Sequence, residues 1–572
     1  MSDIFFLVLR RLRLPLIVLI FVYAAATLGM TLIPGVDDQG NVYRMSFFHA
    51  FYFVSFTGTT IGFGEIPYAF TDSQRAWVIV CLYTSVVAWL YGIGNMLRLL
   101  QDETFLKAVA HRAFQGSIAR IDLPFYIICG YGQTGELINH GLAELAIQTV
   151  IVDHNLERTR SLELDDLTIA PIVLNADITQ PQNLVAAGIS HPLCQGVIAV
   201  TQDDHINLQI AVASKLIDKS VPVICRSEIE DEAANMASFG TDSIINPYLT
   251  FSQRLSLLAH NPALHRIQNW FINQHSAEHL AEHIAQHGLP GGRWILCGYG
   301  RFGQAVKQNV KREDLEIVVV DIDPESHGAP ADSIVGRGTE AKTLQEAGID
   351  KATVIVAASD DDANNLSILI TARQLNKDIF TIGRVNREAN HSLFIHADCD
   401  YIMRRSQVVA NEVLTIISRP LVTKFVSFSK TLTSGNIQKL INDIDELTGG
   451  RDPITWRLVI DEENAPAFAR YLRNDRSLTV NDVSQHQMLP SARTIPLLLQ
   501  RGDVSHLMPA LDTELKIGDE LLLCGKRGQH SLAQRLRHNP ELVDSLINNN
   551  PHHIPLMRWL SRRRVAQSKR HY

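Results

Sequence analysis

The sequence predicts a multi-domain chain: an α-helical two-span membrane domain, two tandem α/β domains with doubly wound parallel sheets, and a C-terminal α+β subdomain. Three observations indicate this class. The 572 residues are enough for roughly three or four folded units. Two long uncharged apolar runs lie in the first hundred residues, and one pattern of strand, glycine-rich turn and helix occurs twice further on.

The composition argues against two classes of protein. The formal net charge is −8, from 52 basic and 60 acidic side chains, so no long-range attraction draws a nucleic acid to the chain, and no nucleic-acid partner is expected. The seven cysteines are scattered and form no CxxC pair, which argues against a disulfide framework and against a zinc site. Most of the chain is therefore expected in a reducing cytosol.

Two apolar runs, residues 14–33 and 76–97, are long enough to cross a lipid bilayer as helices. Arginines precede the first run and follow the second, whereas the segment between the runs carries acidic residues. The positive-inside rule then places both termini in the cytoplasm, and we expect a multi-pass protein of the cell (inner) membrane. A cleaved signal peptide is the alternative for the first run, which is long for the apolar core of such a peptide.

The segment between the two runs predicts a re-entrant loop. Residues 45–57 are apolar but too few to span the membrane. Non-helical backbone at membrane depth is tolerated only where it lines a cavity or is buried in protein, and glycines at alternate positions allow successive carbonyls to point the same way. The motif that follows has this pattern and consists of Thr60, Ile61, Gly62, Phe63, Gly64 and Glu65.

This motif, TIGFGE, resembles the selectivity filter of potassium channels, whose usual pattern is TVGYGD. The resemblance implies that K⁺ is the transported ion and that backbone carbonyls of the motif, with the hydroxyl of Thr60, are its ligands. Phe63 has no hydroxyl with which to hold the filter from behind, so the degree of selectivity for K⁺ over Na⁺ stays open. A chance glycine-containing turn between two helices is the alternative interpretation.

Two glycines, Gly92 and Gly94, lie in the cytoplasmic half of the second apolar run. Similar channels bend at such a place to open, so both glycines are candidates for a gating hinge. Small residues also let membrane-spanning helices pack closely. The sequence leaves both roles open.

A repeated motif organises the rest of the chain. An apolar strand runs into G-x-G-x-x-G twice, and each time a second apolar strand ends in an aspartate, with an offset of 168 residues between the two occurrences. The residues are Gly130, Gly132, Gly135 and Asp153 in the first module, and Gly298, Gly300, Gly303 and Asp321 in the second. This series forms the full dinucleotide-binding fingerprint, so we expect two Rossmann-like domains.

Each part of the fingerprint has a physical role. The first glycine allows the tight turn, the second lets a pyrophosphate approach the backbone, and the third lets the helix pack on the strand. The helix N-terminus favours an anion. An aspartate can accept hydrogen bonds from both ribose hydroxyls, which favours NAD, ADP or ATP over a 2′-phosphorylated nucleotide. The alternative is that one module keeps the fold and has lost the ligand.

The repeat continues with an offset of 158 residues, so that Thr201 corresponds to Ser359 and Arg226 to Arg384. Two such modules behind a two-span pore resemble an arrangement found in prokaryotic ligand-gated potassium channels. In these channels the modules are called regulator of potassium conductance domains, and they are of the TrkA nucleotide-binding type. By this resemblance Asp177 lies near the nucleotide, and Arg301 reaches phosphates across a dimer. The other candidates for nucleotide contact are Gln133, Thr134, Thr201, Arg226, Phe302, Ser359 and Arg384.

The resemblance also implies an assembly and a second ligand. One filter segment cannot encircle an ion, so a homotetramer is expected, and its eight modules would form a cytoplasmic ring. Acidic residues after Arg226 bind calcium in some relatives, which makes Glu228 and Glu230 candidate Ca²⁺ ligands. A solvated acidic helix start is the preferred interpretation of these acids.

The expected domain boundaries follow the motifs. They are a pore domain over residues 1–100, a linker over 101–122, a first Rossmann-like regulatory domain over 123–290, a second over 291–430, a C-terminal regulatory subdomain over 431–535 and a basic tail over 536–572. A helix-rich stretch follows each Rossmann unit, at residues 248–274 and 406–426. Each stretch is expected to cross over to a partner module.

The sequence therefore predicts a potassium-selective channel that is gated by NAD, ADP or ATP, with a divalent cation as a further candidate ligand. No enzymatic reaction is expected. Two alternatives stay open: a membrane-anchored regulatory subunit of a potassium transporter, and an NAD-dependent oxidoreductase, for which no catalytic constellation stands out. The sequence gives neither the sign of the nucleotide effect nor the module that binds each ligand.

Overall fold

The computed structural model describes residues 2–162, 167–272, 284, 288–474, 476–485 and 493–547. The chain divides into two compact units, Met1–Ile121 and Asp122–Tyr572, and each is described by itself. From residue 548 onward, the expected basic tail lies outside the described residues.

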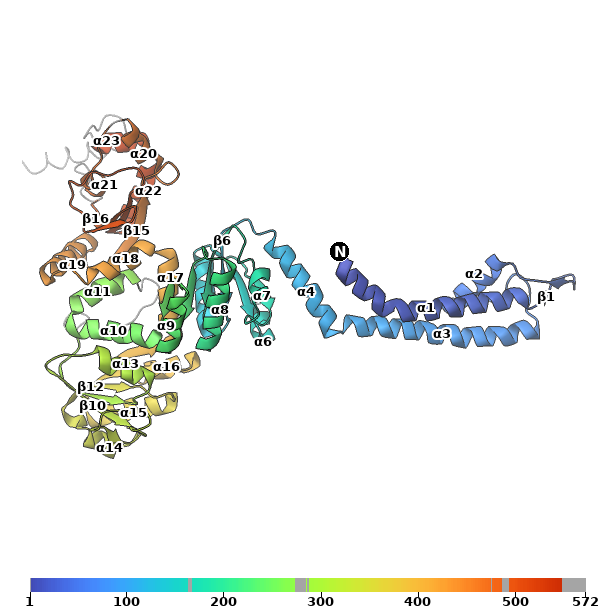
Figure 1. Cartoon of the computed structure of the whole chain (residues 1–572), viewed down its shortest axis with the longest axis horizontal. Helices are drawn as coiled ribbons and strands as arrows, with labels where there is room; N and C mark the ends of the chain where they lie inside the picture. Colours follow the sequence, from blue (N-terminus) through green and yellow to red (C-terminus); the bar gives the residue numbers. More distant parts are fainter. Residues whose placement is uncertain are drawn as a thin grey trace, which may run out of the picture. The chain divides into compact units, whose positions relative to one another are not determined.

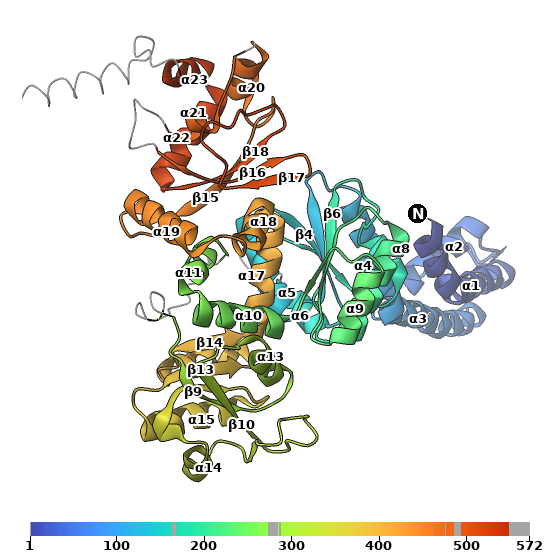
Figure 2. The ribbon, with the colours of Figure 1, turned by 60° about the vertical axis from the view of Figure 1, so that its left-hand side comes forward.

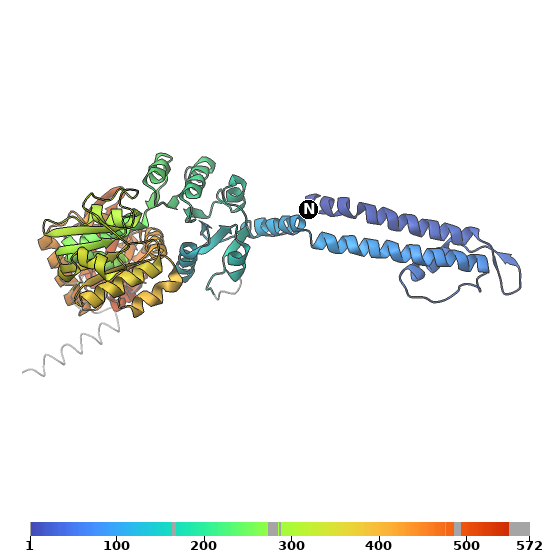
Figure 3. The same ribbon diagram turned by 90° about the horizontal axis from the view of Figure 1, so that it is seen from below.

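The first unit is built on two long helices that lie side by side and run in opposite directions (Figures 1 and 3). Its elements are α1 (Ser2–Leu32), β1 (Gly35–Val36), β2 (Val42–Tyr43), α2 (Phe47–Gly58), α3 (Asp72–Leu100) and α4 (Glu103–Ile118). The stretches Leu12–Leu32 and Asp72–Leu100 are long and apolar enough to cross a membrane. They overlap the two apolar runs of the sequence, and α4 occupies most of the expected linker.

The short helix α2 packs against both long helices. Its residues Phe53 and Phe56 are buried in an apolar cluster that also contains side chains of α1 and α3. The indole nitrogen of Trp77 on α3 donates a hydrogen bond of 3.2 Å to the carbonyl of Ala26 on α1. Gly29 makes this approach possible, because an added Cβ there would lie 2.2 Å from the indole ring.

The second unit begins with a six-stranded parallel sheet in the order β5-β4-β3-β6-β7-β8 (Figure 2). Its strands are β3 (Phe125–Cys129), β4 (Gln148–Asp153), β5 (Ile172–Asn175), β6 (Cys194–Ala199), β7 (Val223–Arg226) and β8 (Ser243–Ile245). Its helices are α5 (Gln133–Glu144), α6 (Leu156–Ser161), α7 (Pro181–Ala186), α8 (Asp204–Ile217) and α9 (Glu230–Ser238). The strand order reverses between β3 and β6, and ligands of such sheets bind at the carboxyl ends of the strands at that point.

The second module repeats this design with the parallel order β11-β10-β9-β12-β13-β14. Its strands are β9 (Gly292–Cys297), β10 (Leu315–Asp321), β11 (Ile334–Val335), β12 (Ala352–Ala357), β13 (Phe380–Val385) and β14 (Tyr401–Arg404). Its helices are α13 (Arg301–Asn309), α14 (Ala341–Glu346), α15 (Asp362–Leu375) and α16 (His391–His396), with short 3₁₀ turns η2 (Ile349–Lys351) and η3 (Glu388–Asn390). The prediction of two Rossmann-like domains is confirmed.

Two helices follow each module, and the first helix of each pair crosses to the other module. The pairs are α10 (Pro247–His260) and α11 (Pro262–Ile272) after the first module, and α17 (Arg405–Ser418) and α18 (Pro420–Ser429) after the second. Helix α10 packs on α13, where Phe251 meets Phe302 with ring centroids 5.7 Å apart. Helix α17 packs on α5, where Gly141 accommodates Leu414. The two modules of one chain are therefore partners of each other.

The chain continues into a small α+β lobe, as expected. Its sheet is antiparallel with the order β15-β18-β16-β17. The strands are β15 (Ile454–Val459), β16 (Ile495–Arg501), β17 (Val504–Leu507) and β18 (Glu520–Gly525). The helices are α19 (Ser434–Thr448), α20 (Pro466–Arg473), α21 (Val480–Ser484), α22 (Arg527–His538) and α23 (Pro540–Ile547).

Candidate functional site

The filter-like motif follows α2 directly and is not helical. Its alternate residues Thr60, Gly62 and Gly64 have positive φ angles of 62°, 66° and 97°. When left-handed residues alternate with residues of negative φ, successive peptide groups are rotated so that their carbonyls can point to the same side. An added Cβ at Gly62 or Gly64 would meet nothing within 4 Å. The backbone conformation, and not a lack of space, therefore calls for glycine here.

Aromatic rings and an ion pair support this motif from behind. The ring of Phe63 lies 5.4 Å from that of Phe56, between centroids, and 6.4 Å from that of Tyr52. The carboxylate of Glu65 accepts a 2.9 Å hydrogen bond from Nε of Arg75 and a 2.8 Å hydrogen bond from the backbone nitrogen of Phe70. Phe63 thus contacts aromatic rings of α2, and Glu65 ties the end of the motif to α3.

Helix α3 runs without interruption through Gly92 and Gly94. An added Cβ at either glycine would meet nothing within 4 Å. Close packing inside one chain therefore does not require these glycines. Their role as a hinge stays a prediction.

The first module holds a pocket of about 320 Å³ at the carboxyl ends of its central strands. Gly132, Asp153, Asp177 and Thr201 are among its lining residues. Asp153 is buried, and its Oδ2 accepts a 2.6 Å hydrogen bond from the backbone nitrogen of Tyr131, while its Oδ1 accepts one of 2.7 Å from the backbone nitrogen of Asn155. Two backbone amides thus orient the carboxylate toward the pocket.

Asp177, which also lines this pocket, is held by its own turn. Its Oδ1 accepts hydrogen bonds from the hydroxyl of Thr179 at 2.7 Å and from the backbone nitrogen of the same residue at 3.0 Å. The hydroxyl bond is the main reason why the pKa of Asp177 lies below its ordinary value. The carboxylate is therefore fixed and ionised at neutral pH.

The second module holds a smaller pocket, of about 190 Å³, at the same place in its sheet. Its lining includes Gly300, Asp321, His327, Arg337 and Ser359. Asp321 is also buried and accepts the corresponding 2.6 Å hydrogen bond from the backbone nitrogen of its glycine loop. In addition, Nδ1 of His327 lies 2.7 Å from Oδ1 of Asp321. This hydrogen bond raises the pKa of His327 above its ordinary value.

The first and third glycines of each fingerprint have different structural roles. The first glycines have φ angles of 99° at Gly130 and 101° at Gly298, which a side chain rarely adopts. An added Cβ at Gly135 would lie 2.1 Å from the carbonyl oxygen of Gly130, so this position requires glycine for close packing of helix on strand. Gly303 has the same contact with Gly298. An added Cβ at the middle glycine Gly300 would meet nothing within 4 Å, and one at Gly132 would lie 3.8 Å from Nη1 of Arg158, an ordinary contact.

The described geometry agrees with two families of domains. A TrkA-N domain matches residues 126–247 and again 294–405, and an ion channel domain matches residues 17–102. The chain combines an ion channel domain with two TrkA-N domains. It is homologous in part to archaeal potassium channel proteins.

Relatives of this combination come from archaea and bacteria. Potassium channel protein 1 of Methanocaldococcus jannaschii is 27% identical over 217 residues, which are 38% of this chain and 63% of that protein. The Trk system potassium uptake protein TrkA of Streptomyces coelicolor is 24% identical over 234 residues, which are 39% of this chain and 92% of that protein. The chain thus spans less than two thirds of the length of the first of these relatives. A solved structure described as the GsuK channel bound to NAD is 15% identical, covers 94% of this chain and 100% of its own, and superposes with a TM-score of 0.45.

Several predicted contact residues lie away from the two pockets. Phe302 is fully buried against α10, so its side chain lines neither pocket as described, and its role as a nucleotide contact stays a prediction. Thr134 is buried in the first turn of α5, beside Gln133. Arg226 and Arg384 are buried and paired inside the TrkA-N domains, and they line neither pocket as the structure describes it.

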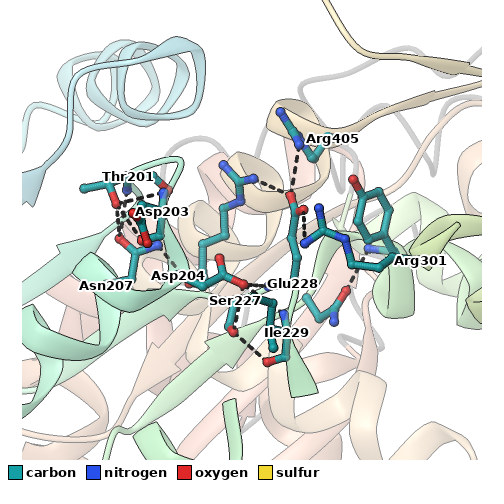
Figure 4. Close-up of polar contacts among 12 residues, drawn as sticks. Thr201, Asp203, Asp204, Asn207, Ser227, Glu228, Ile229, Arg301 and Arg405 are labelled. Atoms are coloured by element: carbon teal, nitrogen blue, oxygen red, sulfur yellow. Dashed lines mark hydrogen bonds and ion pairs between the residues drawn. The ribbon is translucent and has the colours of Figure 1, made fainter. Parts of the chain in front are cut away.

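Glu228, in the first TrkA-N domain, binds three arginines (Figure 4). It pairs with the buried Arg226 beside it, and its two oxygens lie 3.2 Å from Nη1 of Arg301 and from Nη1 of Arg405. Burial opposes ionisation of Glu228, but the charges of Arg226, Arg405 and Arg301 outweigh that effect and lower its pKa. Arg301 and Arg405 belong to the second TrkA-N domain and the helix after it, so this cluster joins the two domains.

This cluster argues against Glu228 as a calcium ligand in the described conformation, because its charge is already neutralised by arginine. Glu230 lies in the first turn of α9 and is exposed, as the interpretation of an acidic helix start expects. Within the described ranges, no group of three or more His, Cys, Asp or Glu side chains is placed to hold a metal ion.

Two further aspartates act as anchors of the loops around the sites. Oδ2 of Asp204 accepts hydrogen bonds from the backbone nitrogens of Glu228 and Ile229 at 2.6 and 2.8 Å (Figure 4). Asp362, at the corresponding place, holds the loop of Asn386 in the second domain. The sequence did not predict that Asp204 and Asp362 hold these loops, nor that His327 binds Asp321. The available signal for the two aspartates was that they occupy equivalent positions in the repeat, 158 residues apart.

Proposed function

We propose that this chain forms a potassium channel whose pore opens or closes when a nucleotide binds to its TrkA-N domains. The observation that carries the proposal is the presence, in one chain, of a filter-like motif with alternating left-handed residues and of two Rossmann-like pockets. Partial similarity to proteins named potassium channels supports K⁺ as the ion. The ligands of the ion would be backbone carbonyls of residues 60–63.

The assembly and ligands follow from the same reasoning. One filter segment cannot surround an ion, so four chains are needed. Their eight TrkA-N domains would form a ring in the cytoplasm. The pore would lie in the inner membrane of the cell. NAD, ADP or ATP fits a pocket in which an aspartate such as Asp153 keeps acceptor positions for a ribose. The nucleotide acts by binding the open and closed states of the ring with different affinity, because equal affinity would shift nothing.

The test is potassium flux from liposomes that contain the purified full chain, measured without nucleotide and with NAD, ADP or ATP. We expect flux that changes with nucleotide and that the Gly62→Ala variant lacks. Gly40→Ala is the matched control, because Gly40 also has a positive φ, of 85°, and open space around it but lies outside the motif. Absence of flux under every condition would refute the proposal.

A second candidate is a membrane-anchored regulatory subunit of a potassium transporter. The similarity to TrkA of Streptomyces coelicolor, which covers 92% of that protein, favours this candidate for the part of the chain that it matches. A regulatory subunit predicts that the chain alone does not conduct and that Gly62→Ala changes nothing. The same flux assay therefore separates the two functions, and no enzymatic reaction is proposed for either.

A further inference from the structure

The two TrkA-N domains differ in how many hydrogen-bond donors already occupy the aspartate at the ribose position. Among the described residues, Asp153 accepts two hydrogen bonds, both from backbone amides. Asp321 accepts three, from the backbone nitrogens of Tyr299 and Asp323 and from Nδ1 of His327. A carboxylate offers about four acceptor positions. Asp153 can therefore accept both hydroxyls of a ribose, whereas Asp321 can accept only one while His327 is in place.

The loop that carries His327 is built to hold it there. The backbone oxygen of His327 accepts a 3.0 Å hydrogen bond from Nε2 of Gln304 on α13, and its backbone nitrogen donates one of 3.2 Å to the carbonyl of Asp323. The carboxylate of Asp323 in turn accepts a 2.6 Å hydrogen bond from the hydroxyl of Ser326. The position of His327 is thus set both by α13 and by its own loop.

The first domain has no such group among its described residues. The position that corresponds to His327, by the offset of 168, is Thr159, whose hydroxyl donates to the carbonyl of Leu156 within α6. His154 is the imidazole that follows Asp153 in the chain, but its Nδ1 lies 3.8 Å from Oδ1, beyond hydrogen-bond distance, and its side chain is 82% exposed. An imidazole that is hydrogen-bonded to the aspartate at the ribose position is therefore found, among the described residues, in the second domain and not in the first.

We propose that His327 is a specificity-determining residue that weakens the binding of ribose nucleotides to the second pocket while it occupies Asp321, so that the first domain is the high-affinity ribose nucleotide site. The inference rests on the proposed binding of nucleotides to the TrkA-N domains. Ribose hydroxyls compete with an imidazolium for the same carboxylate oxygen. The second site therefore gains affinity for ADP as the imidazolium loses its proton.

The charges around His327 favour the imidazolium. Asp321 on β10, Asp323 on the same loop and Asp360 after β12 face it, and all three raise its pKa, with the hydrogen bond to Asp321 as the largest cause. Arg337 lines the same pocket after β11, and Arg384 on β13 pairs with Asp360 at 2.6 Å. The raised pKa extends the pH range over which the imidazolium is paired with Asp321, and the pair weakens as pH rises through that pKa.

The experiment is calorimetric titration of the full chain in detergent with ADP, at about pH 6 and about pH 8.5, below and above the ordinary pKa of histidine. The Gly132→Leu background blocks the first pocket and leaves the second. In this background we expect the affinity for ADP to rise about tenfold between the two pH values, which is the equivalent of one hydrogen bond to a charged group that no longer competes for Asp321. Adding His327→Ala is expected to give the higher affinity at both pH values.

Two further variants and one further ligand sharpen the test. His327→Asn keeps a neutral donor near the position of Nδ1 and is expected to abolish the pH dependence without reaching the affinity of His327→Ala. His154→Ala, the matched change in the first domain, is expected to leave the pH dependence of the second site as it was. In the His327→Ala variant, ADP is expected to bind more tightly than 2′-deoxy-ADP, because the deoxy sugar lacks one of the two hydroxyls that can donate to Asp321.

Three results would overturn the inference. In the Gly132→Leu background, His327→Ala could leave the affinity for ADP at about pH 6 unchanged, or the pH dependence could survive this change. The double variant could also bind no nucleotide, while the Gly300→Leu variant, in which only the second pocket is blocked, still binds one. A failure of the proposed function looks different. In that case neither the unmodified chain nor the Gly300→Leu variant, which keeps the first pocket, binds NAD, ADP or ATP at any pH.

Discussion

Replacing Gly132 by leucine is expected to weaken nucleotide binding in the first TrkA-N domain strongly and to leave the fold intact. Gly132 precedes α5 with a φ of −91°, which any residue adopts. An added Cβ would lie 3.8 Å from its nearest heavy atom, Nη1 of Arg158, which is an ordinary contact. The new side chain would instead occupy the surface that a pyrophosphate approaches.

The magnitude follows from the hydrogen bonds that a phosphate would lose. The N-terminus of α5 offers backbone amides to an anion, and each hydrogen bond to a charged group contributes about 1.5–3 kcal/mol. Loss of one or two such bonds costs about 3 kcal/mol, which corresponds to an affinity about a hundredfold weaker. Titration calorimetry with ADP in the Gly300→Leu background isolates this site, and a thermal melt of the same sample monitors the fold.

Gly135→Ala is the contrasting variant from the same loop. Its Cβ would lie 2.1 Å from the carbonyl oxygen of Gly130, so the strand or the helix must shift and the melting temperature is expected to fall. The reasoning is refuted if Gly132→Leu binds ADP as tightly as its parent. It is also refuted if Gly132→Leu unfolds while Gly135→Ala melts normally.

Three other changes have defined outcomes. Gly62→Ala forces a side chain onto a φ of 66°, so potassium flux from liposomes should be lost, whereas Gly40→Ala should conduct normally. Glu228→Gln leaves the buried Arg226 without its counter-charge and should lower the free energy of unfolding by about 3 kcal/mol in denaturant titrations at neutral pH. Because the pKa of Glu228 is lowered, this contribution is present at neutral pH and is lost as pH falls through the lowered value, so parent and variant should converge in strong acid. Gly94→Ala should fold normally, because an added Cβ there meets nothing within 4 Å. If Gly94 is a gating hinge, the change should alter the open probability of the channel, and an unchanged open probability would contradict the hinge.

Local sequence patterns were enough to predict the sheets and the backbone of each site. The first glycine and the aspartate of a fingerprint are 23 residues apart in both modules; the glycine follows one strand, and the aspartate ends the neighbouring parallel strand. This spacing brings the carboxylate to the backbone nitrogen that follows the glycine, as the 2.6 Å bonds of Asp153 and Asp321 confirm. The two apolar runs could likewise be recognised from length and charge alone.

Side chains whose surroundings come from distant segments could not be predicted in the same way. Phe302 occupies a motif position near the phosphate-binding turn, but α10 from the other domain covers it. Glu228 resembles a calcium ligand until Arg405, 177 residues further along the chain, is placed beside it. Such neighbours depend on how the crossing helices pack, and no periodicity in the sequence encodes that packing.

The two TrkA-N domains share the residues that stabilise the fold and differ in residues at or near the second pocket. The glycines, the ribose-position aspartates and the loop anchors Asp204 and Asp362 recur at fixed offsets. Arg301 stands in place of a glutamine and His327 in place of a threonine; His327 lines the second pocket, and Arg301 lies in the first turn of α13. Because Arg301 also binds Glu228 of the first domain, any anion that draws it toward the second pocket would weaken a contact between the domains. The Arg301–Glu228 ion pair therefore links the first turn of α13 to the first domain.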